Sequence, residues 1–101
     1  MFVEAIVSED GKILTQKIFG KLDISIFTEF NNSYQDKIDS VSKVILDFKK
    51  VEYVDSSGLG ILLVLRERSG GDDADIDIIN ISPGVRKILE TTKFQLLFNM
   101  K

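Results

Sequence analysis

Along the first twenty residues, apolar and polar positions alternate in two short runs separated by a turn. Residues 2–7 alternate weakly and end at the cluster Ser8–Gly11, which contains an Asp-Gly pair. Residues 12–19 alternate again, with Leu14 and Ile18 on the same parity. A period of two on both sides of an Asp-Gly turn predicts a two-stranded hairpin.

The pattern then changes to a helical period. Residues 20–23 break the alternation and are expected to form a loop, after which Asp23 or Ser25 can cap a helix. Four large side chains follow at three- and four-residue spacing, namely Ile26, Phe27, Phe30 and Tyr34. We expect the three aromatic ones to pack in the core.

The rest of the chain alternates between strand and helix patterns. A β-branched apolar run predicts a buried strand at 45–48, followed by a connection at 49–53. The Leu-rich, Pro-free segment Leu59–Arg68 suits a helix that stops at the glycine pair 70–71. The last expected elements are a strand at 76–81, a helix that starts at Ser82-Pro83, and a short strand at 95–98.

The resulting element order, ββαβαβαβ, predicts an α/β fold. Strands that alternate with helices form parallel crossover units, so we expect a mostly parallel sheet covered by helices, with an N-terminal hairpin, in a single domain over residues 1–101. Function in such folds lies in the loops at the carboxyl ends of the strands. The segments 20–23 and 54–58 both follow strands and are therefore expected at the same edge.

The heptad Val54–Gly60 (VDSSGLG) places two serines where a helix begins. The unpaired N–H groups and the dipole of a helix start favour negative charge, so a serine there can carry a phosphate without disrupting the fold. Helical spacing puts Leu59 and Leu63 on the face of Ser56, while Ile61, Leu62 and Leu65 point toward the sheet. Leu59 and Leu63 are then either a protein-contact surface or are covered by a neighbouring helix.

The same heptad has a structural interpretation, because Asp, Ser and Gly are ordinary capping and turn residues. Two enzymatic interpretations fail on the residues present. A nucleophile elbow needs Gly two positions before the serine, where Val54 stands. A phosphate-binding P-loop needs a longer Gly-rich loop that ends in Lys-Ser or Lys-Thr.

Composition narrows the classes of function further. The sequence has no His and no Cys, which removes Ser-His and Cys-His catalysis, thiolate zinc sites and disulfides, so we expect no enzyme and no metal or cofactor. A net charge of −3 argues against nucleic-acid binding. No signal pattern or membrane-length apolar run is present, so a cytoplasmic protein that does not insert into membranes is expected.

Three segments in this order resemble the STAS domain of bacterial anti-sigma factor antagonists. Residues 20–23 (GKLD) resemble the family's Gly-x-Leu-Asp signature, and 55–60 (DSSGLG) resemble its phospho-acceptor loop. Residues 81–89 (ISPGVRKIL), followed by Lys93-Phe94, resemble its last helix. The resemblance covers essentially the whole chain.

The resemblance implies a function and its residues. The unphosphorylated protein would bind a serine-kinase anti-sigma factor and release the sigma factor; phosphorylation of Ser56 would end binding, and a serine phosphatase would reset the switch. The implied partner-binding residues are Gly20, Leu22, Asp23, Asp55, Ser57, Gly58, Leu59 and Leu63. Ser57 is the weaker candidate acceptor, and a monomer or weak dimer is expected.

Three alternatives remain. One is a subunit of a lipid ABC transporter that docks on the nucleotide-binding subunit, although its relatives diverge more in the serine loop. A stressosome component usually carries an additional N-terminal domain. The third is a small-molecule binder at the helix start, but the chain lacks a Gly-rich cradle and a basic anchor near Ser56.

The chain departs from the family pattern in two places. The segment 72–75 is unusually acidic, and the chain stops where many members continue into a C-terminal helix.

Overall fold

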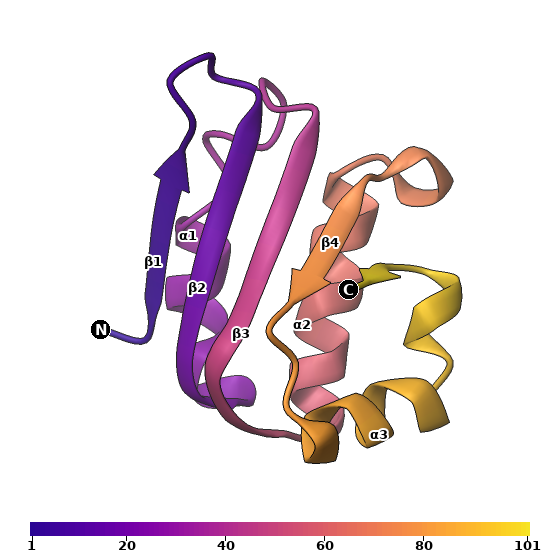
Figure 1. The fold of residues 1–101 in the computed structure, drawn as a ribbon. Helices are drawn as coiled ribbons and strands as arrows, with labels where there is room; N and C mark the ends of the chain where they lie inside the picture. The colour runs from indigo at the N-terminus through magenta and orange to yellow at the C-terminus, as the bar shows by residue number, and fades with distance from the viewer.

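The computed structural model describes all 101 residues as an α/β sandwich of one sheet and its helices (Figure 1). The strands are β1 (Val3–Val7), β2 (Ile13–Leu22), β3 (Lys43–Val54), β4 (Ile76–Ile79) and β5 (Asn99–Met100). The α-helices are α1 (Phe27–Asn32), α2 (Ser56–Arg68) and α3 (Pro83–Thr91), with the short 3-10 helices η1 (Ile24–Ile26), η2 (Gly71–Asp73) and η3 (Phe94–Leu96). The predicted element order is confirmed.

The sheet runs in the order β1-β2-β3-β4-β5. The β1–β2 hairpin is antiparallel, and every other neighbouring pair is parallel. Helices α1 and α2 lie on one face of the sheet, whereas no helix crosses the opposite face (Figure 1). The predicted α/β fold, with a mostly parallel sheet and an N-terminal hairpin, is therefore confirmed, with one sheet face left open.

The core lies between the sheet and the helices α1 and α2. Alternate strand residues point into it, so that Leu14, Ile18 and Leu46 are almost fully buried. From α2, the three side chains that were predicted to face the sheet do so, since Ile61, Leu62 and Leu65 are at most 2% exposed. The strand residues between the buried ones point the other way and line the open face of the sheet.

Both central strands are longer than the sequence predicted. β2 continues through the expected loop at 20–23 as far as Leu22, and β3 continues through the expected connection at 49–53 as far as Val54. The cause is a pair of bulges between them. The register passes from Lys17↔Asp47 to Phe19↔Lys50 and then from Gly20↔Val51 to Lys21↔Tyr53, so β3 advances by one residue more than β2 each time. A bulge interrupts the period of two without ending the strand, and the interrupted pattern was mistaken for loops.

Three further expectations were wrong. Phe27 is 40% exposed rather than buried, because Ile26 and Phe30 supply the core contacts of this segment. β4 ends at Ile79, because Asn80 adopts a left-handed φ of 57°. The segment 95–98 is not a strand: Lys93 is also left-handed, and η3 then places Phe94 and Phe98 in the core, four residues apart and stacked.

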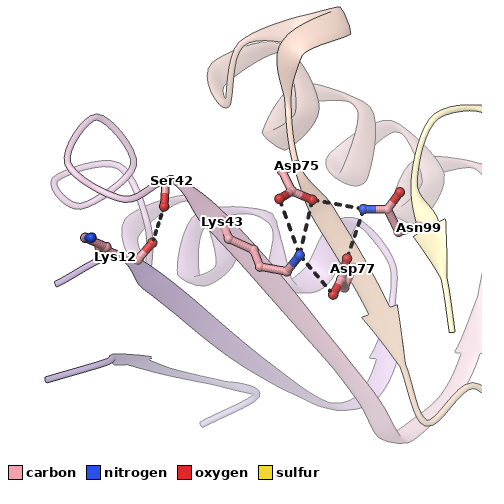
Figure 2. Close-up of polar contacts among 6 residues, drawn as sticks. All are labelled: Lys12, Ser42, Lys43, Asp75, Asp77 and Asn99. Carbon is pink, nitrogen blue, oxygen red and sulfur yellow. Dashed lines mark hydrogen bonds and ion pairs between the residues drawn. The ribbon is translucent and has the colours of Figure 1, made fainter. Parts of the chain in front are cut away.

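A polar network on the open face ties the last two strands to β3 (Figure 2). Lys43 Nζ lies 3.3 Å from carboxylate oxygens of both Asp75 and Asp77. The amide nitrogen of Asn99 donates to the same two carboxylates at 2.9 Å. β5 has only two residues, so these side-chain bonds supplement a short ladder of backbone bonds.

Candidate functional site

The serine loop begins where β3 ends, at the carboxyl edge of the parallel strands. Asp55 follows Val54 in an extended conformation and is the N-cap of α2. Its Oδ1 accepts hydrogen bonds from Gly58 N at 2.9 Å and from the Ser57 hydroxyl at 2.6 Å. One carboxylate oxygen thus fixes the first turn of α2, as an Asp N-cap does in general.

The two serines of this turn differ in their contacts. The Ser57 hydroxyl is half-buried and donates to Asp55. The Ser56 side chain is exposed, and its hydroxyl makes no hydrogen bond within the protein. Ser56 is therefore the hydroxyl that a second protein can reach without breaking a contact.

The loop carries negative charge before any modification. The hydrogen bond from the Ser57 hydroxyl, followed by that from the Gly58 N–H, lowers the pKa of Asp55 below its usual value. Asp55 is consequently ionised at neutral pH, one residue from Ser56. A phosphate on Ser56 would add about −1.5 to −2 charge beside this carboxylate.

Gly58 allows the first turn of α2 to pack against the end of β2. A Cβ on Gly58 would overlap the carbonyl oxygen of Leu22 and lie 2.8 Å from its carbonyl carbon. At Gly60, by contrast, a Cβ would meet no atom within 4 Å. The two glycines of the motif thus have different roles: Gly58 permits close packing, while Gly60 leaves the helix surface open.

The segment 20–23 lies beside the serine loop, as the topology predicted. Leu22 pairs with Val54 in the parallel ladder, and its carbonyl oxygen accepts from Asp55 N at 3.4 Å. Asp23 then caps η1 much as Asp55 caps α2, because its Oδ1 accepts from both the backbone N–H and the hydroxyl of Ser25. Two Asp-x-Ser turns, 23–25 and 55–57, therefore stand side by side.

The predicted site residues divide into three groups. Leu22 and Gly58 are buried and support the loop, and Gly20, with a φ of 83°, allows β2 to continue next to the bulge. Asp23, Asp55, Ser56 and Ser57 line the edge itself. Leu59 is half-buried and Leu63 is 39% exposed, so no neighbouring helix covers the outward face of α2.

Two exposed apolar side chains just after Asp23 were not predicted to be exposed. Ile24, on η1, is 67% exposed, and Phe27, at the start of α1, is 40% exposed. η1 contacts α2, so the exposed Ile24 lies on an element that adjoins the helix of Leu59 and Leu63. Ile24 has the position in the first Asp-x-Ser turn that Ser56 has in the second, and that repeat was a detectable signal. We call Ile24, Leu59 and Leu63 the serine-edge surface.

The structure contains no cluster of three or more His, Cys, Asp or Glu side chains placed to hold a metal ion. None of its helices combines the length and the apolar character needed to span a membrane.

Comparison with known proteins assigns the family. The profile of the STAS domain family matches residues 4–101. The chain belongs to the STAS domain family. It is also 38% identical over 100 residues to a STAS-domain containing protein of Pseudomonas aeruginosa strain UCBPP-PA14, with 99% of both chains covered.

Solved structures share the fold at lower sequence identity. The anti-sigma factor antagonist SpoIIAA in its unphosphorylated form superposes with a TM-score of 0.75 at 22% identity, over 98% of this chain and 86% of that one. The phosphorylated form of SpoIIAA from Bacillus gives 0.69 at 18% identity, over 98% and 90%. A sulfate transporter family protein from Wolinella succinogenes gives 0.75 at 16% identity, over 94% and 81%. The same fold is thus found in proteins with names as different as an anti-sigma factor antagonist and a sulfate transporter family protein.

Proposed function

We propose that this STAS domain is an anti-sigma factor antagonist whose binding is switched off by phosphorylation of Ser56. In the unphosphorylated form it binds an anti-sigma factor that is also a serine kinase, and the sigma factor is released. The kinase phosphorylates Ser56 and the complex separates, and a serine phosphatase restores the binding form. The chain is then the substrate of both enzymes and no enzyme itself, and it acts in the cytoplasm.

The observation that carries the proposal is the free, exposed Ser56 hydroxyl at the start of α2, next to the serine-edge surface. Ser57 is held by Asp55, whereas Ser56 is available to a kinase. Exposed apolar side chains on η1 and α2 give a partner something to bury. The acceptor therefore lies within the surface whose affinity it would control.

Charge explains how one phosphate could end the binding. The unmodified edge already carries the carboxylates of Asp23 and Asp55. A phosphate beside them would have to be desolvated against the partner, at a cost of several kcal/mol if it stays unpaired. A loss of 1.4 kcal/mol already weakens affinity about tenfold, so this cost is sufficient for a switch.

A phosphorylation assay tests the acceptor. The chain and two variants, Ser56→Ala and Ser57→Ala, are incubated with ATP and the serine-kinase anti-sigma factor of the same organism. Intact mass then reports phosphate incorporation. We expect one phosphate on the unchanged chain and on Ser57→Ala, and none on Ser56→Ala.

The alternative outcomes are equally clear. Phosphate retained in Ser56→Ala but lost in Ser57→Ala would show that Ser57 is the acceptor and would contradict the proposal for Ser56. Absence of phosphate from all three proteins, with no binding to the kinase, would contradict the antagonist function. Retrieval of transporter ATPase subunits by the native chain would then favour the lipid ABC transporter subunit instead.

A further inference from the structure

The open face of the sheet contains a hollow lined largely by lysines. Its volume is about 140 Å³, and it is bordered by Lys17, Ile18 and Phe19 of β2 and by Asp47, Lys49 and Lys50 of β3. That volume is several times the roughly 30 Å³ of one water molecule in the liquid, so a ligand of a few heavy atoms fits. Because Lys17 and Asp47 point away from the core, the hollow lies on the face opposite α1 and α2.

The first bulge between β2 and β3 brings these lysines together. In a regular strand, consecutive side chains point to opposite faces, and one of Lys49 and Lys50 would enter the core. Here the register shift at Phe19↔Lys50 leaves both of them exposed, beside Lys17 on the neighbouring strand. Bulges re-aim side chains in this way and occur preferentially near functional sites.

The lysines of the hollow form no close ion pair inside the protein. None of the ion pairs in the structure involves Lys17, Lys49 or Lys50, whereas Lys43 on the same face pairs with two aspartates. Three lysines and one aspartate give the hollow a net charge of +2, in a chain whose net charge is −3. Glu4 lies opposite Lys17 across the hairpin but forms no ion pair with it.

Asp47 is the one carboxylate of the hollow, and its contacts hold it in place. Its Oδ1 accepts from the backbone N–H of Lys49 and from the side-chain amide of Asn80, each at 3.0 Å. These bonds fix the bulge and the end of β4, and they leave the charges of Lys17 and Lys49 only partly compensated.

We propose that this hollow binds a small, multiply charged oxyanion, with a phosphate or sulfate group held between Lys17, Lys49 and Lys50. Ammonium groups on flexible stems suit such a ligand, because each can donate to a different oxygen. The site is separate from the serine edge and does not depend on the function proposed for Ser56. It would give the protein a means of sensing a phosphorylated or sulfated small molecule through its free sheet face.

Amide chemical-shift perturbation tests the proposal. Pyrophosphate and sulfate are titrated in turn into the isotope-labelled chain at constant ionic strength, because surface attraction is screened within about 8–10 Å at 0.1–0.15 M salt. We expect saturable shifts centred on Lys17, Asp47, Lys49 and Lys50. The comparison of the two anions distinguishes a phosphate-type ligand from a sulfate-type one.

Variants that remove one charge from the hollow test whether its lysines attract the anion and its aspartate repels it. Lys49→Gln should weaken pyrophosphate binding about threefold to tenfold, whereas Lys87→Gln, on exposed α3, should leave it unchanged. Asp47→Asn keeps an oxygen that accepts both hydrogen bonds but removes the negative charge, so it should tighten binding by about the same factor.

Two results would overturn the site. One is a set of shifts that do not saturate, or that are equally large at lysines far from the hollow such as Lys87. The other is an Asp47→Asn protein that remains folded by circular dichroism but binds pyrophosphate no better than the unchanged chain. Should Asp47→Asn fail to fold, undiminished binding by Lys49→Gln decides against the proposal.

Discussion

At the residue scale, the serine loop is organised by a single carboxylate oxygen. Asp55 Oδ1 holds both Ser57 and the N–H of Gly58, and this arrangement leaves Ser56 as the hydroxyl without a partner. The sequence placed two serines at a helix start but could not separate them from residue types alone, and the family resemblance was needed to choose Ser56. The hydrogen bond to Ser57 now supplies a physical reason for that choice.

The same oxygen predicts a titration effect. Replacing Ser57 by Ala removes the hydrogen bond that contributes most to lowering the pKa of Asp55, so we expect this pKa to rise toward its usual value. Because the pKa of Asp55 is lower in the folded protein than the unfolded value near 3.9, its ionised carboxylate stabilises the fold at pH values above 3.9. This stabilisation is lost as the pH falls through the folded pKa. A carboxyl-detected NMR titration measures the change; an identical Asp55 pKa in both proteins would contradict the assigned contact.

The two glycines of the motif make a matched pair for a stability experiment. Gly58→Ala should destabilise the protein by about 1–3 kcal/mol, because the new Cβ overlaps the Leu22 backbone. Gly60→Ala should be neutral or stabilise it by up to about 1 kcal/mol, since its Cβ enters open space and Ala favours the helix. Urea unfolding measures both. Equal effects at the two positions would argue against the close approach of α2 to β2.

At the element scale, helix α2 separates a buried stripe from an exposed apolar stripe. Periodicity alone predicted this division, since Leu62 is fully buried while its neighbour Leu63 is 39% exposed. The strands were less predictable. The consecutive exposed residues Lys49 and Lys50 resemble a loop in the sequence, and the long-range pairing that keeps them in β3 has no local signal.

Truncation of two adjacent leucines tests whether the buried and exposed sides of α2 have different roles. Leu62→Ala should cost about 2–5 kcal/mol of stability, as core truncations do. Leu63→Ala should change stability by about 0.5 kcal/mol or less, but should weaken binding to the anti-sigma factor. Unfolding curves and calorimetric titration provide the two readouts. Should Leu63→Ala bind as tightly as the unchanged chain, the serine-edge surface would lose its proposed role.

At the scale of the whole molecule, the C-terminal edge of the sheet depends on polar contacts. Asp77 accepts from Asn99 and pairs with Lys43, linking β5 to β4 and β3 (Figure 2). Burial alone would raise the pKa of Asp77, but the hydrogen bonds from Asn99 and Lys43 outweigh burial and lower it. No sequence pattern indicates this network, because its members are far apart along the chain and the last strand was predicted in the wrong place.

The network predicts how stability depends on pH. The contribution of Asp77 is present above the unfolded pKa near 3.9 and is lost as pH falls below about 4, through the lowered folded pKa. The free energy of unfolding should therefore fall less between pH 5 and about 2 in Asp77→Asn than in the unchanged chain. Asp39→Asn, at an exposed position outside any ion pair, is the control. An unaltered slope in Asp77→Asn would show that the network does not contribute.

The central claim, that Ser56 is a phosphorylation switch on a partner-binding edge, is tested most directly by comparing two affinities. The dissociation constant for the serine-kinase anti-sigma factor is measured by calorimetry for the unmodified chain and for the chain phosphorylated stoichiometrically on Ser56. We predict tight binding by the unmodified form and a loss of at least about tenfold on phosphorylation. Equal affinities of the two forms would contradict the switch.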